Sequence, residues 1–320
     1  MISVVIPLYN KESTIERTIA SVLAQSVTDW ELIIVDDGST DNSLALARQF
    51  EDPRIRLVTQ ANAGVSAARN HGVEQSSNSI VAFVDADDYW APAHLASIKQ
   101  LLGRFPDASI FATAYFIVDE TGRVRKTRLR DETDNLEKQL ALDYFTAALG
   151  VAPPVCSSAV AVSKAAFKKI GGFPLGIKAG EDLLTWARLA CVGNVAYSMT
   201  ATAYIAAPPV SVARNHNAIR RPAKPDIVGN ELAKLDLKYG QVRSGPRRYR
   251  GDWYRMRATL FMELGERVNC LIELTKSVKA SGIRFRDVVS LGLLLLPTRV
   301  RANLLSRWRQ RHVVSANAIQ

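Results

Sequence analysis

The 320-residue sequence has few of the features that mark exported or membrane-spanning proteins. Its three cysteines are an odd number without metal-ligand spacing, which excludes a simple disulfide framework and a cysteine metal site. The longest apolar run, residues 288–296, is interrupted by a serine and a glycine and is shorter than the roughly 20 residues that span a bilayer. The start, Met1 to Ile6, lacks the basic segment and cleavage site of a signal peptide. We therefore expect a cytoplasmic protein without a transmembrane helix.

Basic residues outnumber acidic ones in the chain. The 41 lysines and arginines exceed the 31 aspartates and glutamates, which gives a formal net charge of +10 and predicts an anionic partner. Much of the excess lies late, in residues 243–250 and 299–311. Because no nucleic-acid-binding module accompanies these segments, we expect the partner to be something other than nucleic acid.

Three carboxylates follow an apolar run in the first half of the chain. Residues 79–84 have the composition of a buried strand, and Asp85, Asp87 and Asp88 come directly after it. At the end of a buried strand these charges would repel one another, and a bound divalent cation is a general way to hold them together. The segment therefore predicts a metal site.

Short β-branched runs alternate with amphipathic segments up to about residue 115. The predicted strands are Ile2 to Ile6, Glu31 to Val35, Ile55 to Val58, Ile80 to Val84 and Ser109 to Thr113. Helices are predicted between them, one begun by a capping box of Ser13 and Glu16 and one capped by Asp41 or Asn42. This alternation predicts an α/β fold, in which a mostly parallel sheet carries helices on both faces.

Polar clusters follow four of the predicted strands. They are Tyr9-Asn10, Asp36-Asp37-Gly38-Ser39, Asn62-Ala63-Gly64 and Asp85-Ala86-Asp87-Asp88. Ligands of such sheets bind outside the carboxyl ends of the strands, so we expect the clusters to line one crevice. Asp36 and Asp37 can accept bonds from a base or ribose, or can serve only a turn. Gly64 opens a helix whose N-terminus suits a phosphate, and Arg69 is either a cation beside it or a surface residue.

In this order and spacing, four segments resemble the family 2 glycosyltransferases, which have the GT-A fold. They are Pro7 to Asn10, Val35 to Asp41, Asn62 to Asn70 and Asp85 to Asp88. The resemblance implies a Rossmann-like, mixed and mostly parallel GT-A domain over residues 1–218, with a nucleotide-sugar half (1–115) and an acceptor half (116–218). A mostly helical, basic region (219–320) follows. The resemblance also implies a nucleotide-diphosphate-sugar donor, for which it favours uridine diphosphate over thymidine or guanosine diphosphate, and an inverting transfer.

The resemblance implies roles for individual residues on the donor side. The nucleotide-sugar-binding residues it indicates are Pro7, Tyr9, Asp36, Asp37, Asn62, Gly64, Arg69, Asp85 and Ala86. Among them, Tyr9 would lie against the nucleobase and Asp37 would bond the base. Arg69 would lie beside base and phosphates, and Asp85 would face the ribose.

The resemblance implies that the metal is Mg²⁺ or Mn²⁺, held by Asp87 and Asp85 and bridging the diphosphate, and such ions take oxygen ligands of this kind. Such an ion would neutralise the charge on the departing diphosphate. Asp88 is either a further ligand or the cap of a helix entered at Pro92. His216, in a stretch whose lead-in departs from the family pattern, is either another ligand or a surface residue.

The second half of the chain supplies a candidate general base. Glu181 and Asp182 begin an apolar segment with helical spacing, where carboxylates can simply complement the helix dipole. Together with Gly180 they match the acceptor-side motif of the resembled family, which implies that Asp182 removes the proton from the acceptor hydroxyl and that Glu181 assists it. Residues 171–174 would form a turn that leads to this site.

Beyond about residue 220 the sequence is mostly helical in pattern. Residues 291–308 combine leucines with interleaved arginines, and such a segment can lie on an anionic membrane or pack its leucines on the catalytic domain. Both alternatives stay open. The first would place the protein at the inner face of the plasma membrane.

These observations predict a metal-dependent, inverting glycosyltransferase that adds one sugar to a hydroxyl of a saccharide or lipid-linked saccharide, in the assembly of a polysaccharide or lipid-linked oligosaccharide. The membrane spans and the Gln-x-x-Arg-Trp motif of the processive synthases are missing from the sequence. Two alternatives remain. One is a nucleotidyltransferase, although no glycine- and lysine-rich phosphate loop follows the first predicted strand, and the other is a non-catalytic protein that binds sugar nucleotides.

Overall fold

The computed structural model describes residues 1–129, 139–148, 153–177, 179–207, 221–241, 245–297, 300 and 304. Contacts divide the chain into two compact units. The first combines residues 1–143 with 154–207, and the second combines residues 144–153 with 208–320. Each unit is described by itself.

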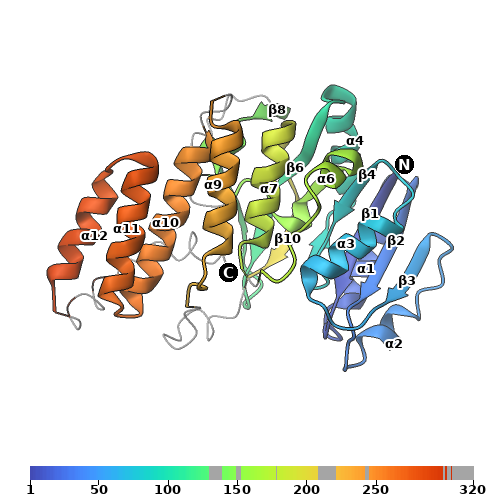
Figure 1. The fold of residues 1–320 in the computed structure, drawn as a ribbon. Helices are drawn as coiled ribbons and strands as arrows, with labels where there is room; N and C mark the ends of the chain where they lie inside the picture. Colours follow the sequence, from blue (N-terminus) through green and yellow to red (C-terminus); the bar gives the residue numbers. More distant parts are fainter. Residues whose placement is uncertain are drawn as a thin grey trace. The chain divides into compact units, whose positions relative to one another are not determined.

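The first unit is built on a sheet whose described strands run in the order β3-β2-β1-β4-β9-β6-β10-β5, with β7 beside β6 and β8 beside β10 (Figure 1). The strand bounds are β1 Ile2–Leu8, β2 Trp30–Asp36, β3 Ile55–Thr59, β4 Ile80–Phe83, β5 Tyr89–Trp90, β6 Ala108–Val118, β7 Val124–Lys126, β8 Gln139–Leu142, β9 Val160–Ser163 and β10 Asn194–Ala206. Strands β3, β2, β1 and β4 are parallel, and β9 runs antiparallel between β4 and β6. The predicted α/β fold with a mixed, mostly parallel sheet is confirmed.

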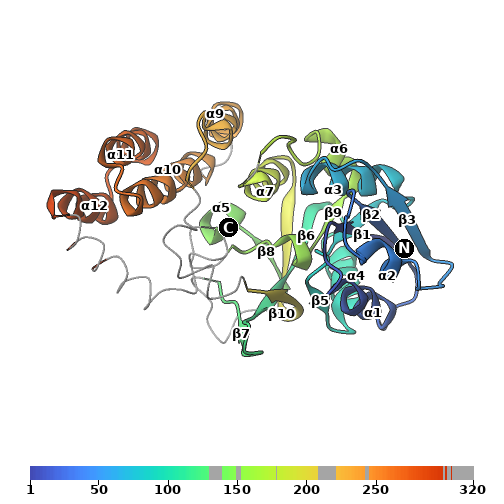
Figure 2. The same ribbon diagram turned by 90° about the horizontal axis from the view of Figure 1, so that it is seen from below.

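Helices cover both faces of this sheet (Figure 2). Helices α1 (Ile15–Leu23), α2 (Ser43–Ala47) and α4 (His94–Arg104) lie on one face, and α3 (Val65–Gln75), α6 (Lys164–Lys169) and α7 (Glu181–Val192) lie on the other. Apolar residues spaced three and four apart in α1 and α4 pack against the strands, because helices bury one stripe of side chains. On the opposite face, Phe173 meets Phe83 and Trp186 edge to face at centroid distances of 5.4 and 5.5 Å.

The predicted capping box at the start of α1 is wrong. The N-cap is Thr14, and its side chain makes no capping bond. Its hydroxyl donates instead to the Ala86 carbonyl at 2.9 Å, which ties α1 to the segment after β4. At the second helix the N-cap is Asn42, and the Asp41 carboxylate accepts a bond from the Ser43 N–H at 2.9 Å.

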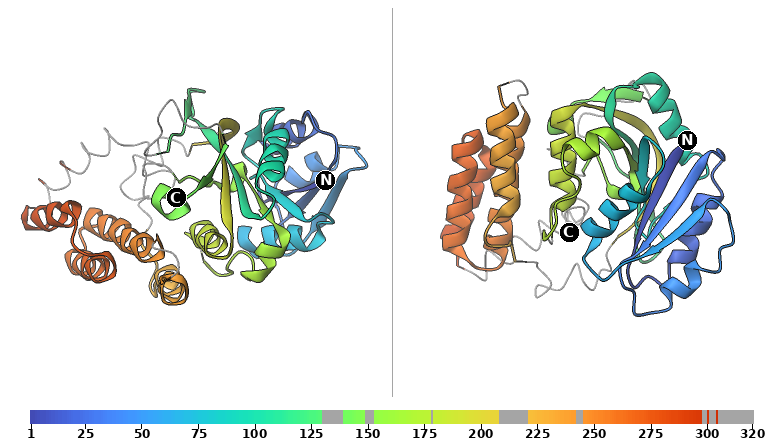
Figure 3. Two further views of the ribbon diagram at one scale, coloured as in Figure 1. Left: turned by 90° about the horizontal axis from the view of Figure 1, so that it is seen from above. Right: turned by 45° about the vertical axis from the view of Figure 1, so that its right-hand side comes forward.

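The second unit is helical, as the sequence predicted. Its described helices are α5 (Tyr144–Ala147), α9 (Ile227–Tyr239), α10 (Gly245–Glu263), α11 (Arg267–Ser281) and α12 (Phe285–Leu295), and the last four lie side by side (Figure 3). A small apolar core of Phe261, Met262, Cys270, Leu274 and Leu294 joins α10, α11 and α12. No helix in the described residues is both long and apolar enough to cross a bilayer.

Internal ion pairs neutralise part of the positive charge of this unit. Arg255 forms two parallel bonds of 2.8 Å to Asp287, and both side chains are buried. Arg257 is also buried and lies 3.3 Å from carboxylate oxygens of Asp226 and Glu273. These arginines therefore stabilise the fold of the second unit.

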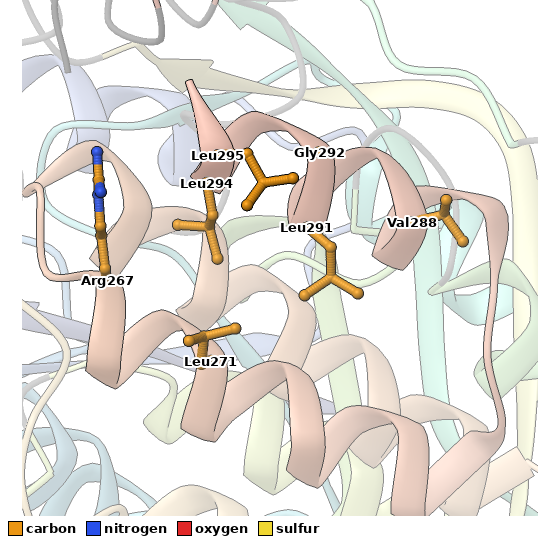
Figure 4. Close-up of a pocket in the computed structure, with 7 residues that line it drawn as sticks. All are labelled: Arg267, Leu271, Val288, Leu291, Gly292, Leu294 and Leu295. Atoms are coloured by element: carbon orange, nitrogen blue, oxygen red, sulfur yellow. The ribbon is translucent and has the colours of Figure 1, made fainter. Parts of the chain in front are cut away.

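An apolar groove of about 480 Å³ lies between α11 and α12 (Figure 4). It is lined by Arg267, Leu271, Val288, Leu291, Gly292, Leu294 and Leu295. Several large apolar side chains of these two helices are exposed to solvent, among them Phe285 at 81% and Leu295 at 87%. This part of the second unit therefore presents an apolar surface next to a cation.

Candidate active site

The carboxyl ends of β1, β2 and β4 meet at one edge of the sheet, as the strand pattern predicted. The parallel register pairs Leu8 with Asp36, and it pairs Val5 with Phe83. The segments that leave these strand ends are the predicted polar clusters. Pro7 lies within β1 opposite Val35.

The turn after β1 is tied to the turn after β2. Asn10 has a positive φ of 50°, and its side-chain oxygen accepts a bond from the Thr40 N–H at 2.8 Å. Its own N–H donates to the Ser39 hydroxyl at 3.2 Å. Tyr9 is 46% exposed beside this link. The two turns therefore form one wall, and the Tyr9 side chain is open to a ligand.

The Asp37 carboxylate holds the segment that follows β3. Its oxygens accept bonds from the Gln60 side chain at 2.7 Å and from the backbone N–H groups of Ala63 and Gly64 at 2.9 and 2.8 Å. A carboxylate offers about four lone-pair sites, so the protein uses most of the capacity of this group. The structure thus gives Asp37 a part in ordering the loop, which the sequence did not predict.

The other predicted residues near these turns are Asp36, Asn62 and Gly64. Asp36 is buried, and its carboxylate accepts a bond from the Ser39 N–H at 3.3 Å. Asn62 is exposed. Gly64 is the N-cap of α3 with φ +89°, a conformation that favours glycine. The Gly64 N–H already donates its hydrogen to the Asp37 carboxylate.

Arg69 and Asp85 form the central ion pair of the site. The guanidinium Nη2 donates to Asp85 Oδ1 at 2.6 Å, with side-chain exposures of 4% for Arg69 and 31% for Asp85. Burial opposes the charge of Arg69, but Asp85, Glu181 and Asp182 together raise its pKa. Within the described part of the chain, its Nε and Nη1 are buried without a hydrogen-bond partner. The Asp85 carboxylate and the acidic pair of α7 thus both interact electrostatically with one arginine.

The acidic pair occupies the first turn of α7, as predicted. Gly180 precedes it in the left-handed conformation, and Asp182 Oδ1 accepts a bond from the Leu183 N–H at 2.7 Å. Burial raises the pKa of Asp182, although the Leu183 bond and the Arg69 charge oppose the shift. Burial and the neighbouring Asp182 also raise the pKa of Glu181. A carboxylate with a raised pKa is a stronger base, which suits proton abstraction.

Asn70 connects α3 to the turn that precedes this pair. Its side-chain amide donates to the Phe173 carbonyl and accepts from the Phe173 N–H, both at 2.8 Å. Gly172 must be small here, because a Cβ would lie 2.6 Å from the Asn70 oxygen. Asn70 ends the Asn62 to Asn70 motif, and no role was predicted for it. Asn70 and Phe173 are 103 positions apart, so no local sequence pattern could have paired them.

Asp88 faces away from the crevice and into the protein, and its predicted role as a helix cap is wrong. Its carboxylate accepts bonds from the Ser158 hydroxyl at 2.5 Å and the Ala206 N–H at 2.8 Å, whereas Ala93 is the N-cap of α4. Burial, with the charges of Asp85 and Asp87, raises the pKa of Asp88. The Ser158 hydroxyl also accepts from the Asp85 N–H at 2.9 Å. Ser158, which sequence analysis missed, therefore supports two of the three aspartates.

The fit of a divalent metal can be judged from the oxygens that the structure presents. The described residues hold no group of three or more His, Cys, Asp or Glu side chains that could bind an ion. Mg²⁺ and Mn²⁺ sites that include a diphosphate need only one or two carboxylates, and Asp87 is 35% exposed. Asp85 is paired with Arg69, and His216 lies outside the described residues. Asp87 therefore fits as the main protein ligand.

The backbone around Asp87 is fixed by α1. The Ala86 carbonyl accepts bonds from the hydroxyls of Thr14 and Thr18 at 2.9 and 3.0 Å, and the Asp87 carbonyl accepts from Arg17 at 2.8 Å. The Asp87 carboxylate itself lies 2.5 Å from the ammonium of Lys11. No role for Lys11 was predicted from the sequence, so this ion pair is a finding of the structure.

Comparison with known sequences agrees with these motifs. The sequence model described as glycosyl transferase family 2 matches residues 3–171, more than half of the chain. A similar sequence is the uncharacterized glycosyltransferase YibD of Escherichia coli, 48% identical over 89 residues, or 27% of this chain and 26% of that protein. Another is the E. coli UDP-Glc:alpha-D-GlcNAc-diphosphoundecaprenol beta-1,3-glucosyltransferase WfgD, 42% identical over 91 residues, or 28% of this chain and 36% of that protein. These matches thus span about a quarter to a third of the relatives' own length.

Solved structures share the fold. The chain is similar to TarS of S. aureus, crystallised with UDP-GlcNAc, at a TM-score of 0.66 and 17% identity over 94% of this chain and 88% of that one. It is also similar to the mannosyltransferase PcManGT of Pyrobaculum calidifontis, in complex with GDP-Man and Mn²⁺, at a TM-score of 0.57 and 19% identity over 98% and 85% of the two chains. At these identities the likeness concerns the fold alone.

Proposed function

The chain belongs to glycosyl transferase family 2, and from this premise we propose that it transfers one sugar, with inversion, from a nucleotide-diphosphate-sugar to an acceptor hydroxyl. The observation that carries the proposal is the grouping of Asp85, Glu181 and Asp182 around Arg69. In this arrangement a proposed donor-side carboxylate and a candidate base both interact with the same arginine.

On the donor side, the wall formed by the turns after β1 and β2 is proposed to receive the nucleoside. Tyr9 is exposed and can lie against the base, while Asp37 orders the neighbouring loop and retains lone-pair capacity for a base N–H. Asp85 is partly exposed next to Arg69, where it can accept bonds from ribose hydroxyls. Uridine diphosphate is the proposed nucleotide, which accords with the UDP-glucose in the name of WfgD and the UDP-GlcNAc bound to TarS.

On the acceptor side, Asp182 is proposed as the general base. Its carboxylate would take the proton from the acceptor hydroxyl as the oxygen forms a bond to the anomeric carbon and the bond to the diphosphate breaks. An inverting displacement needs one base, unlike the paired carboxylates of a glycoside hydrolase. Glu181, beside it, would contact the acceptor. The Asn70 link to Phe173 would hold the preceding turn in place for this step.

Asp87 is proposed to hold Mg²⁺ or Mn²⁺ together with the donor diphosphate, with Asp85 as a further candidate ligand. When bound, the ion would neutralise charge on the leaving diphosphate. The partly exposed Asp87 carboxylate and its fixed backbone support this assignment. The Mn²⁺ in the PcManGT complex accords with it.

The acceptor is proposed to be a saccharide or lipid-linked saccharide, and the second unit to rest on an anionic membrane. The exposed apolar side chains of α11 and α12 would enter the headgroup region while Arg267 and Arg286 meet anionic lipids. Sedimentation with vesicles of phosphatidylcholine and phosphatidylglycerol tests this. Phe285→Glu should reduce binding, whereas Leu237→Glu, at an exposed apolar residue of α9, should not.

A thermal-stability screen tests donor use. Uridine, thymidine and guanosine diphosphate sugars would each be added to the protein with and without Mn²⁺. We expect at least one uridine diphosphate sugar to raise the melting temperature, with a larger rise in the presence of Mn²⁺. If no nucleotide sugar stabilises the protein under either condition, the proposed function is wrong.

A further inference from the structure

Lys11 places a cation on the carboxylate that is proposed to bind the metal. Its ammonium lies 2.5 Å from Asp87 Oδ2, and the two side chains are 40% and 35% exposed. The Lys11 backbone is fixed between β1 and α1, since its N–H donates to the Ser43 hydroxyl at 2.6 Å and its carbonyl accepts from the Thr14 N–H at 3.0 Å. The long side chain therefore starts from a rigid point and can move at its free end.

The three aspartates after β4 differ in how their charge is balanced. Asp85 is paired with the buried Arg69, and Asp88 is bonded to Ser158 inside the protein. Asp87 is paired with an accessible lysine instead. An exposed ion pair of this kind is weak, so it can exchange partners readily.

A divalent ion that binds Asp87 from solvent must compete with this ammonium. At such short range the two cations repel each other, so binding both to this carboxylate is less favourable than binding either one alone. A diphosphate changes the balance, because its oxygens offer the lysine a second anionic partner next to the first. Asp87 and phosphate oxygens can then neutralise the metal, while other phosphate oxygens neutralise the Lys11 ammonium.

We propose that Lys11 acts as an internal competitor for the metal at Asp87 and turns to the donor diphosphate when the donor arrives. This inference rests on the proposed function and deepens it. It makes metal binding depend on the nucleotide. The ion binds weakly to the free protein and tightly once a diphosphate is present, which favours joint loading of metal and donor.

Titration of the protein with Mn²⁺, with free Mn²⁺ followed by electron paramagnetic resonance, tests the proposal without turnover. In the absence of nucleotide, we expect Lys11→Met to bind Mn²⁺ about tenfold more tightly than the unmodified protein. Lys11→Arg should match the unmodified protein because it keeps the charge. Lys99→Met is the matched control, since Lys99 forms an exposed pair with Asp29 at 2.9 Å in another part of the unit. It should change nothing.

The same titrations with uridine diphosphate complete the test. We expect uridine diphosphate to tighten Mn²⁺ binding by the unmodified protein more than by Lys11→Met, whose own affinity for uridine diphosphate should fall. Adding Asp87→Asn to Lys11→Met should abolish the tighter Mn²⁺ binding. The inference is overturned if Lys11→Met binds Mn²⁺ no more tightly than the unmodified protein, or if the double variant keeps the gain. Either result leaves the proposed function standing as long as a nucleotide sugar still stabilises the protein.

Discussion

Arg69 Nη2 lies 2.6 Å from Asp85 Oδ1, and this ion pair joins helix α3 to the segment that follows β4. The arginine is buried and the aspartate is partly exposed, so the pair has one fixed and one accessible partner. Although burial opposes the charge of Arg69, Asp85, Glu181 and Asp182 raise its pKa. One arginine therefore balances charge on Asp85 and on the acidic pair of α7.

Replacement of Arg69 by methionine should remove this balance. We expect kcat/KM for the donor to fall by about 100-fold or more, because Asp85 loses its partner and the acidic pair loses a nearby cation. The unfolding free energy should fall as well, so circular dichroism must first show that the variant is folded. Arg56→Met is the matched control, since Arg56 makes exposed bonds to Gln75 and should leave kcat/KM within a few-fold.

The pH dependence of turnover should report Asp182. Burial raises the pKa of this carboxyl above its usual value, and a general base works only when it is deprotonated. We therefore expect kcat to fall as the pH falls through this raised pKa, at a pH higher than the value of about 4 at which an ordinary aspartate titrates.

The Arg69→Met variant tests the direction in which the Arg69 charge shifts the pKa of Asp182. The Arg69 charge lowers the pKa of Asp182, so its removal should move the acidic limb of kcat to still higher pH. The measurement is kcat at saturating donor from pH 4.5 to 9 for both proteins. A profile that stays flat to the acidic end in the unmodified protein would contradict the role of Asp182.

Ser158→Ala should destabilise the first unit. The hydroxyl donates to the buried Asp88 and accepts from the Asp85 N–H, and removal of one partner of a buried group costs about 1–3 kcal/mol. Urea unfolding followed by circular dichroism measures the change. Ser97→Ala, at a helical serine bonded only to its own helix backbone in the described structure, should cost much less. Equal losses in the two variants would contradict the supporting role of Ser158.

Arg255→Met should destabilise the second unit. Arg255 and Asp287 are buried and doubly bonded, and removal of one partner of a buried pair costs about 3–5 kcal/mol. Guanidinium unfolding followed by tryptophan fluorescence can measure the loss. Lys234→Met breaks an exposed pair with Glu231 and should cost about 1 kcal/mol or less. A small loss in Arg255→Met would mean that these basic residues are not structural.

The parts of the fold that follow local rules could be predicted from the sequence. Strands β1 to β4 are short apolar runs bounded by turn residues, and parallel strands bring their carboxyl ends to one edge whatever the details of packing. The position of Glu181 and Asp182 in the first turn of α7 followed from helical spacing. Such features need no knowledge of distant residues.

The details of the site depend on contacts between distant residues, and these could not be predicted. The Asp85 N–H finds Ser158 across 73 positions, and Asn70 finds Phe173 across 103. The capping pattern at Ser13 and Glu16 misled because the helix has Thr14 as its N-cap, and the Thr14 hydroxyl donates to the distant Ala86 carbonyl. In each case the chain offers several local partners, and tertiary packing decides among them.

The most direct test of the account is donor hydrolysis by Asp182→Asn. The nucleotide sugar that gives the largest thermal stabilisation is incubated with Mn²⁺ and either protein, and release of the nucleoside diphosphate is followed. The account predicts that the donor stabilises Asp182→Asn as strongly as it stabilises the unmodified protein. It also predicts that Asp182→Asn releases the nucleoside diphosphate at least about 100-fold more slowly. Release at the unmodified rate by Asp182→Asn, with donor binding intact, would contradict the account.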